Sequence, residues 1–234
     1  MLLYPVNLNL TSRLCLVVGG GPVALRKTRG LLAGGADVRI ISPKILADLL
    51  ILVQQGEVEW FEREFVEGDL KGVFMVFAAT NDQKVQARIM EEATRDNVLV
   101  NSVDDPRGSD FHVPAHFRRG SMLVTVATGG GSPALARLLR RQLEESLDPG
   151  YGAVVELLGL IRDEIVTRDD NFDAHGRLFR RLLEKDLVEL TLKEQWFDLQ
   201  VLLLQELPKD VDAVTIMKKL LENQDKPDRK DPVS

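Results

Sequence analysis

The chain has 234 residues, of which 44% are hydrophobic, and a formal net charge of −6. This is enough apolar mass for the core of a soluble globular protein with one large domain or two small ones. The acidic charge argues against non-specific nucleic-acid binding, and the longest apolar run, Val73–Ala79, is far too short to span a bilayer. Cys15 is the only cysteine, which excludes an internal disulfide and a cysteine metal cluster. Together with an N-terminus that lacks the pattern of a secretory signal, this favours a reducing, cytoplasmic setting.

A buried strand, a three-glycine turn and the start of a helix follow one another in residues 16–27, LVVGGGPVALRK. Gly19, Gly21 and Ala24 fit the G-x-G-x-x-G/A fingerprint of dinucleotide-binding proteins. Gly19 permits the tight turn out of the strand, and Gly21 lets a pyrophosphate approach the backbone because it has no Cβ. Ala24 is small enough for the helix to lie close to the strand. The stretch favours a bound nicotinamide or flavin dinucleotide over a glycine-rich turn without a ligand.

The residues after this turn define the rest of the predicted cofactor site. Pro22 suits the first turn of a helix, whose free N–H groups and positive dipole end attract phosphates. In many such folds an acidic residue about 20 positions further on binds the ribose. Here Asp37 lies at the start of the next predicted strand, away from the cofactor end, and Ser42-Pro43-Lys44 stand at the far end of that strand. Lys44 fits either a 2′-phosphate or a solvated surface position, so NAD and NADP both stay open.

Apolar runs and helical patterns alternate as far as Val103. Residues 1–13 are a lead-in that forms an edge strand or packs on the core. The alternation predicts an α/β fold with a doubly wound parallel sheet. The expected strands are Arg13–Val18, Asp37–Ile41, Val58–Arg63, Val73–Ala79 and Leu99–Val103, and the expected helices are Val23–Leu32, Ile45–Gln55 and Lys84–Asp96.

Two polar segments follow predicted strands, at the sheet edge where such folds bind ligands. Thr80 and Asn81 come after two alanines, which leave room for a nicotinamide ribose, and they also suit a strand end with a helix cap. Asp104-Asp105 follow the next strand, where a carboxylate is placed to take a proton while a hydride leaves. The alternative is a turn in which aspartate caps the backbone, and the residues favour neither interpretation.

The pattern changes after Asp104. Two further strands and then only helices are expected, with a polar tail that contains two prolines and is expected to be disordered. The expected strands are Phe111–Phe117 and Met122–Thr128, and the expected helices are Ala134–Leu147, Val154–Ile165, Arg177–Leu190, Lys193–Leu207 and Val211–Leu221.

A second glycine turn, Thr128–Pro133, opens the helix that begins at Ala134 and offers another anion site. Several arginines surround it in the sequence: Arg118, Arg119, Arg137, Arg140 and Arg141. Such a cluster fits a polyanionic substrate held by bidentate carboxylate contacts. The alternative is a solvated helix face on which Glu144 and Glu145 pair with some of them. The functional interpretation is favoured for Arg118, Arg119 and Arg137 only.

The histidines do not predict a metal site. His112 and His116 are four apart, but Pro114 lies between them and argues against a helix. On a strand an i,i+4 pair lies about 13 Å apart, too far for shared ligation. His112 by itself fits a position that faces the cleft near Asp104.

Four motifs in order and spacing resemble the N-terminal module of siroheme synthases: VVGGGPVALRK, AATND, NSVDDP and TGGGSPALARLLR. The match covers about residues 1–150 closely. The resemblance implies a precorrin-2 dehydrogenase, an oxidoreductase of tetrapyrrole (porphyrin) biosynthesis that oxidises precorrin-2 to sirohydrochlorin with NAD⁺. In some members the same site inserts ferrous iron, a ferrochelatase (lyase) activity that gives siroheme; whether it is present here stays open. The methyltransferase domain of trifunctional relatives is absent from the sequence.

The resemblance also implies an organisation: 1–110 an NAD-binding Rossmann domain, 111–148 a dimerisation and substrate region, 149–222 a helical domain and 223–234 a disordered tail. A homodimer that binds neither nucleic acid nor membrane is expected. Asp104 matches the family aspartate assigned to both dehydrogenation and chelation. The expected cofactor contacts are Gly19, Gly21, Pro22, Val23, Ser42, Pro43, Lys44, Thr80 and Asn81. The expected substrate contacts are His112, Arg118, Arg119, Thr128, Gly129, Gly130, Ser132 and Arg137.

Two other functions compete with this one. A dehydrogenase for another small acid has no need of the arginine cluster. An NAD(H)-sensing regulatory module without catalysis needs no polyanion pocket, so the arginines count against it as well.

Overall fold

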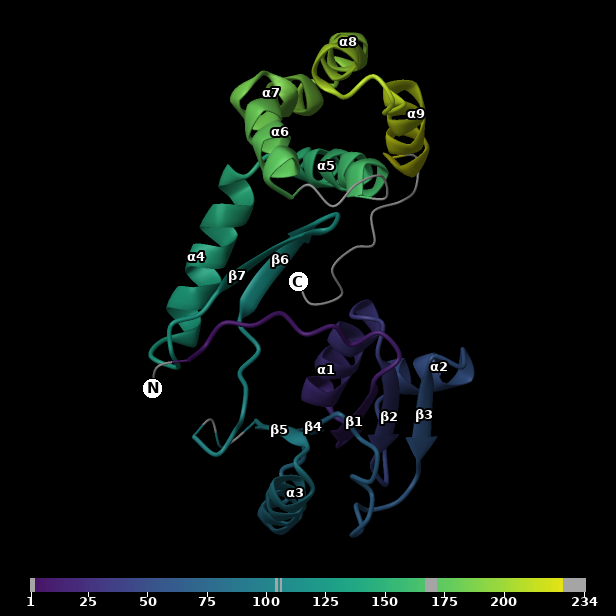
Figure 1. Cartoon of the computed structure of the whole chain (residues 1–234). Helices are drawn as coiled ribbons and strands as arrows, with labels where there is room; N and C mark the ends of the chain where they lie inside the picture. Colours follow the sequence, from purple (N-terminus) through teal and green to yellow (C-terminus); the bar gives the residue numbers. More distant parts are fainter. Residues whose placement is uncertain (1–2, 104, 106, 167–171, 225–234) are drawn as a thin grey trace. The chain divides into compact units, whose positions relative to one another are not determined.

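A computed structural model describes residues 3–103, 105, 107–166 and 172–224 (Figure 1). The chain divides into two compact units. The first reaches to Pro114 and includes Gly129–Gly131, and the second contains Ala115–Thr128 and continues from Ser132. Among the described residues, no helix is long and apolar enough to cross a membrane.

The first unit is built on a five-stranded parallel sheet with the strand order β3-β2-β1-β4-β5. After β1 the chain adds two strands on one side and then returns to add two on the other, so the topological switch point lies between β1 and β4. The strands are β1 (Leu14–Val18), β2 (Asp37–Ile41), β3 (Val58–Phe61), β4 (Met75–Ala78) and β5 (Leu99–Ser102), and the helices are α1 (Pro22–Ala33), α2 (Ala47–Gln54) and α3 (Gln83–Asp96).

Both faces of this sheet are covered, which explains the continuous apolar runs of β1 and β4. Residues of α1 and α2 pack on the face that carries Cys15 and Val17 of β1. Residues of α3 pack on the opposite face with Leu16 and Val18, as Figure 1 shows for α1 and α3. The predicted doubly wound α/β fold is therefore confirmed. The lead-in forms no strand over its described residues, and Leu10 packs against the α1 side of the core.

The second unit begins with an antiparallel hairpin and continues in helices. The hairpin turns at Gly120, which has a φ of 53° that L-residues other than glycine rarely adopt. Helix α4 packs along both hairpin strands, and α5–α9 enclose a separate apolar core (Figure 1). The elements are β6 (Ala115–Arg119), β7 (Met122–Val126), α4 (Pro133–Ser146), α5 (Tyr151–Val166), α6 (Phe172–Glu184), α7 (Leu187–Leu192), α8 (Trp196–Glu206) and α9 (Ala213–Gln224).

The expected strand Phe111–Phe117 is wrong at its start, because β6 begins only at Ala115. Pro114 has no N–H to donate to a strand ladder, so regular pairing begins only after it. The carbonyl of Phe111 accepts a hydrogen bond of 2.8 Å from the Asn101 side-chain amide instead.

The single expected helix Arg177–Leu190 is two helices, α6 and α7. Leu182 and Leu187 are both fully buried but five residues apart, a spacing that places them on different sides of a straight helix. The break between the two helices lets both leucines reach the core. Glu194, with a φ of 54°, then ends the α7 segment, so α8 starts at Trp196 and not at Lys193.

The expected disordered tail is wrong for its first two residues. Asn223 and Gln224 are the last residues of α9. The rest of that tail, 225–234, lies outside the described residues.

Candidate functional site at the carboxyl edge of the sheet

A loop leaves the carboxyl edge of the parallel sheet after each of its five strands, and two glycines pack three of these loops together. Gly19, at the end of β1, has a φ of 130°, and a Cβ built on it would lie 2.2 Å from the carbonyl oxygen of Ala79 in the β4 loop. Gly20 is equally constrained on the other side, because a Cβ there would lie 1.9 Å from the carbonyl oxygen of Lys44 in the β2 loop. The backbone N–H of Leu46 also donates to the carbonyl of Gly20, at 3.0 Å.

Gly20 is a position of the site that the fold requires to be glycine and that the fingerprint alone does not identify. The G-x-G-x-x-G/A pattern leaves its second position free, yet the β2 loop requires glycine there. The sequence did contain a sign of it, since three glycines stand in a row where the fingerprint needs two.

Gly21 differs from both, because a Cβ built on it would meet nothing within 4 Å. It is the N-cap of α1, no side chain caps that helix, and Pro22 occupies its first turn. By contrast, Asp82 caps α3 by accepting hydrogen bonds from the N–H groups of Lys84 and Val85. The start of α1 thus combines open space with uncapped N–H groups and a positive dipole end, and the residues present fit a bound pyrophosphate.

Hydrogen bonds of Ser42 stabilise the conformation of the β2 loop. The Ser42 hydroxyl is buried and donates to the Lys44 carbonyl at 2.7 Å, while the Ser42 carbonyl accepts from the indole N–H of Trp60 at 3.0 Å. The side chains of Pro43 and Lys44 are exposed at the same edge. Asp37 pairs in register with Leu14 at the opposite, amino edge, so it is not a ribose ligand of this site.

The β4 loop is pinned to α3. The Thr80 hydroxyl accepts from the N–H of Asp82 at 3.2 Å, and the Thr80 carbonyl accepts from the Gln86 side-chain amide at 2.6 Å. Asn81 is exposed. Both predicted interpretations of Thr80 and Asn81, cofactor edge and helix cap, are compatible with this geometry.

The β5 loop carries the acidic pair. Asp104 lies outside the described residues. Asp105 accepts hydrogen bonds from the backbone N–H groups of Arg107 and Gly108 at 3.1 and 3.0 Å, so its carboxylate closes a turn. Its own N–H donates to the hydroxyl of Ser102 at 3.3 Å. The loop is therefore built by local hydrogen bonds immediately beyond β5.

His112 is half-buried and follows Phe111, whose ring meets that of Phe77 edge-on at 5.4 Å. Among the described residues, no group of three or more histidine, cysteine, aspartate or glutamate side chains is placed to hold a metal ion.

Cys15 is buried in β1, and burial, followed by the charge of Asp37, raises the pKa of its thiol to about 11. It is not a reactive thiol at neutral pH.

The second glycine turn is closed by its own side chains. The Thr128 hydroxyl accepts from the N–H of Ser132 at 3.2 Å and donates to the Ser132 carbonyl at 3.1 Å. The Ser132 hydroxyl caps α4 by accepting from the N–H of Leu135. Gly129 and Gly130 have φ values of 59° and 83°, which this tight turn requires. Unlike α1, α4 therefore has a side-chain cap.

The arginine cluster divides into paired and unpaired members. Arg119 donates to the carbonyl of Glu144 at 3.0 Å and lies 3.6 Å from its carboxylate. Two others form pairs within α4, Arg140 with Glu144 at 2.6 Å and Arg141 with Glu145 at 4.0 Å. The side chains of Arg118 and Arg137 are exposed, and the structure gives them no ion pair with a described residue.

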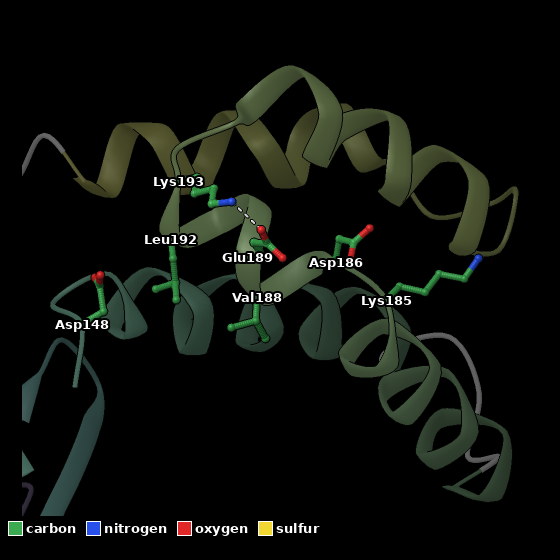
Figure 2. Close-up of a pocket in the computed structure, with 7 residues that line it drawn as sticks. All are labelled: Asp148, Lys185, Asp186, Val188, Glu189, Leu192 and Lys193. Atoms are coloured by element: carbon green, nitrogen blue, oxygen red, sulfur yellow. Dashed lines mark hydrogen bonds and ion pairs between the residues drawn. The ribbon is translucent and has the colours of Figure 1, made fainter. Parts of the chain in front are cut away.

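Each of the two units has a hollow among its described residues. One, of about 440 Å³, belongs to the helical unit; Figure 2 shows Val188 and Leu192 beside a Glu189–Lys193 ion pair. The other, of about 740 Å³, lies at the amino ends of the strands and includes Arg13 and Asp37. Neither contains a predicted site residue.

The comparisons with known proteins agree with this geometry. A family model described as "Putative NAD(P)-binding" matches residues 6–115. The siroheme synthase of Chromobacterium violaceum is 36% identical over 189 residues, which cover 81% of this chain and 40% of that protein. Siroheme synthase 1 of Pectobacterium atrosepticum is 40% identical over 178 residues, covering 76% of this chain and 37% of that protein.

A solved structure titled SirC, precorrin-2 dehydrogenase, matches with a TM-score of 0.69 and 26% identity over 85% of this chain and 99% of that chain. The chain spans about two fifths of the length of the siroheme synthases it matches. Over most of its length the chain is therefore similar to part of the siroheme synthases and to a precorrin-2 dehydrogenase.

Proposed function

We propose that this chain oxidises precorrin-2 to sirohydrochlorin with NAD⁺ as the oxidant. The observation that carries the proposal is the uncapped start of α1 with open space at Gly21, placed at the switch point of the sheet. The family's NAD(P)-binding description and the precorrin-2 dehydrogenase title of the structural relative support it.

In the proposed reaction, precorrin-2 loses two electrons and two protons as one hydride and one proton. NAD⁺, when bound, would accept the hydride and so take up the two electrons. Gly21, Pro22 and Val23 hold its pyrophosphate at the α1 terminus, while Ser42-Pro43-Lys44, Thr80 and Asn81 border it on the two sides. We assign acceptance of the proton to the carboxylate of Asp104, which follows β5 in the sequence.

We further propose that exposed cationic side chains hold the carboxylates of the tetrapyrrole. Arg118 and Arg137 are suited to this because no described carboxylate neutralises them. Arg119 is already engaged with Glu144, so its contribution is to position the hairpin against α4. His112 and the turn residues Thr128, Gly129, Gly130 and Ser132 complete the proposed substrate contacts.

Several wider properties belong to the same proposal. We propose the domain limits 1–110, 111–148 and 149–222. We also propose that the protein is a homodimer, that it is cytoplasmic, and that it binds neither nucleic acid nor membrane. Insertion of Fe²⁺ into sirohydrochlorin, with iron as a substrate, is a further proposed activity of the same site.

An anaerobic assay of the purified protein with precorrin-2 and NAD⁺ tests the proposal. We expect NADH and sirohydrochlorin to form in equal amounts, with NAD⁺ preferred over NADP⁺. Asp104→Ala should keep its affinity for NAD⁺ and lose about 10²-fold or more in turnover, the contribution of a positioned acid–base group. Sirohydrochlorin with Fe²⁺ and no NAD⁺ then tests chelation separately.

Asp37→Ala is a matched control, because it removes an exposed aspartate at the opposite edge of the sheet. It should turn over at the wild-type rate. NAD⁺ binding without turnover by the wild-type protein would overturn the dehydrogenase proposal in favour of a sensing module. Near-normal turnover by Asp104→Ala would overturn the role given to that carboxylate alone.

A further inference from the structure

A buried glutamine joins the β4 loop to the end of β5. Gln86 lies on α3, and its side chain is buried, with 8% of the residue exposed. Its amide Nε2 donates to the carbonyl of Thr80 at 2.6 Å, and its amide Oε1 lies 3.5 Å from the donating hydroxyl of Ser102. One side chain thus contacts both the loop proposed to border the cofactor and the strand end that leads to the acidic pair.

A second set of hydrogen bonds, buried or partly buried, continues from Ser102 into the β5 loop. The Ser102 hydroxyl accepts from the N–H of Asp105 at 3.3 Å. The Ser109 hydroxyl accepts from the N–H of Ser102 at 2.9 Å and donates to the carbonyl of Asp105 at 2.8 Å. Ser102 and Ser109 are 4% and 9% exposed. The chain is therefore held on both sides of position 104, at Ser102 and at Asp105.

The chemistry of this bridge requires an amide. Thr80 offers a carbonyl that needs a donor, and Ser102 offers a hydroxyl that needs an acceptor while it binds Asp105. A carboxamide supplies both, whereas a carboxylate supplies only acceptors and a hydrocarbon supplies neither. Gln86 is thus matched to two different loops, more than a helix needs to pack on a sheet.

We propose that Gln86 is a positioning residue for the oxidation: through Thr80 and Ser102 it fixes the distance between the cofactor loop and the loop that carries Asp104. This inference rests on the proposed function and deepens it. Backbone packed on Gly19 and Gly20 joins the β1 loop to the β4 and β2 loops, and the N–H of Val103 donates to the carbonyl of Ala78 at 3.3 Å. The Gln86 bridge ties β4 to β5, the side of the switch point where the proton is taken.

The test compares Gln86→Leu with the wild-type protein in single-turnover oxidation of precorrin-2 and in NAD⁺ titration. Leucine keeps the approximate size of the side chain and removes both hydrogen bonds. Because small misplacements of reacting groups cost up to about 10²-fold in rate, we expect hydride transfer to fall about tenfold or more while the dissociation constant of NAD⁺ changes less than about threefold. Gln83→Leu makes the same replacement at an exposed position of the same helix and should match the wild type.

Two further variants separate positioning from folding. Gln86→Glu keeps the acceptor for Ser102 and loses the donor for Thr80, so its folded protein should also be slowed, which gives a second measurement if Gln86→Leu folds poorly. In Gln86→Leu/Ser102→Ala the rate loss should be smaller than the product of the single losses, because both variants break one bridge.

An unchanged single-turnover rate in both folded Gln86 variants would overturn the inference. Rate losses that are fully explained by a smaller fraction of folded protein would overturn it as well. Independent, multiplicative losses in the double variant would also overturn it. A wild-type protein that does not oxidise precorrin-2 would instead refute the proposed function, so the two failures are distinct.

Discussion

Lys27 is a charged side chain that the fold half-buries without a carboxylate to pair it among the described residues. Its ammonium lies 4.8 Å from the centre of the Phe77 ring, on the α1 side of the sheet. Burial, followed by the charge of Arg26, lowers the pKa of Lys27 from 10.5 to about 8. The contact with Phe77 offsets part of the cost of burying the charge.

The sign of the resulting pH dependence follows from proton binding. Below about pH 8 the folded and unfolded chains both carry the proton, and the folded state bears the cost of a buried charge. Between about pH 8 and pH 10.5 the folded chain releases the proton and the unfolded chain keeps it, so this cost declines as pH rises.

We therefore expect Lys27→Met to raise the free energy of unfolding by about 1–2 kcal/mol at neutral pH, discounting for the ring contact. The difference from the wild type should shrink at about pH 9.5. Urea titrations at the two pH values measure this, with Lys84→Met, at an exposed lysine of α3, as the control. A difference that does not change with pH would contradict the assignment.

At the scale of single elements, the three-glycine turn joins two different requirements. Gly20 faces the Lys44 carbonyl at a distance that admits no Cβ, whereas Gly21 faces open space. The two glycines are adjacent in sequence but are required for different reasons. The packing of the fold requires glycine at position 20, and the proposed ligand favours it at position 21.

Alanine substitutions separate these two roles. Gly20→Ala should lower the free energy of unfolding by about 2–3 kcal/mol, because the clash is with backbone that cannot rotate away. Gly21→Ala should cost less than about 1 kcal/mol, since its backbone conformation suits alanine, yet it should weaken NAD⁺ binding. Urea denaturation and calorimetric titration of NAD⁺ read the two effects. A Gly21→Ala protein that is the less stable of the pair would contradict this division.

The sequence predicts most elements of the first unit because strand and helix patterns there alternate without interruption. The prediction is wrong where a local pattern is correct but the backbone has to break it to reach the core or to pass a proline. Pro114 delays β6, and the five-residue step from Leu182 to Leu187 divides one apolar helical pattern between α6 and α7. Neither break is visible in hydrophobic spacing alone, since each depends on where the core lies.

The candidate site was predictable to a similar extent. The residues that follow strands were identified from the rule that parallel strands end at one edge. The partners of those residues were not, because Gln86 and Lys44 contact the loops from other elements. Likewise, the pairing of Arg119 with Glu144 depends on how α4 lies along β6, and the sequence does not specify that register.

At the scale of the whole molecule, an exposed apolar stripe on α4 is a candidate contact surface for the proposed homodimer. Leu135, Leu138, Leu139 and Leu143 are all exposed and recur at helical spacing. Exposed apolar patches of this kind mark protein–protein contact sites. The stripe lies in the segment that we propose for dimerisation.

Leu139→Glu should therefore convert a homodimer to a monomer, because it places a charge in the middle of the proposed contact. Light scattering with size-exclusion chromatography measures the mass. Leu204→Glu, at an exposed leucine of α8, is the matched control and should keep the mass of the wild type. A monomeric wild-type protein, or a dimer unaffected by Leu139→Glu, would contradict the assignment of this surface.

The central position of β1 also has a consequence for how the chain reaches its native state. Strand β1 is near the beginning of the chain, yet one of its two neighbours, β4, begins only at Met75. Until β4 has joined it, one side of an almost wholly apolar strand has no hydrogen-bonding partner. The helices α5–α9 are instead neighbours in sequence as well as in space, and contacts of that kind form faster than long-range strand pairing. Closure of β1 with β4 is therefore the step expected to limit refolding, and the interval before it is when the protein is most exposed to aggregation.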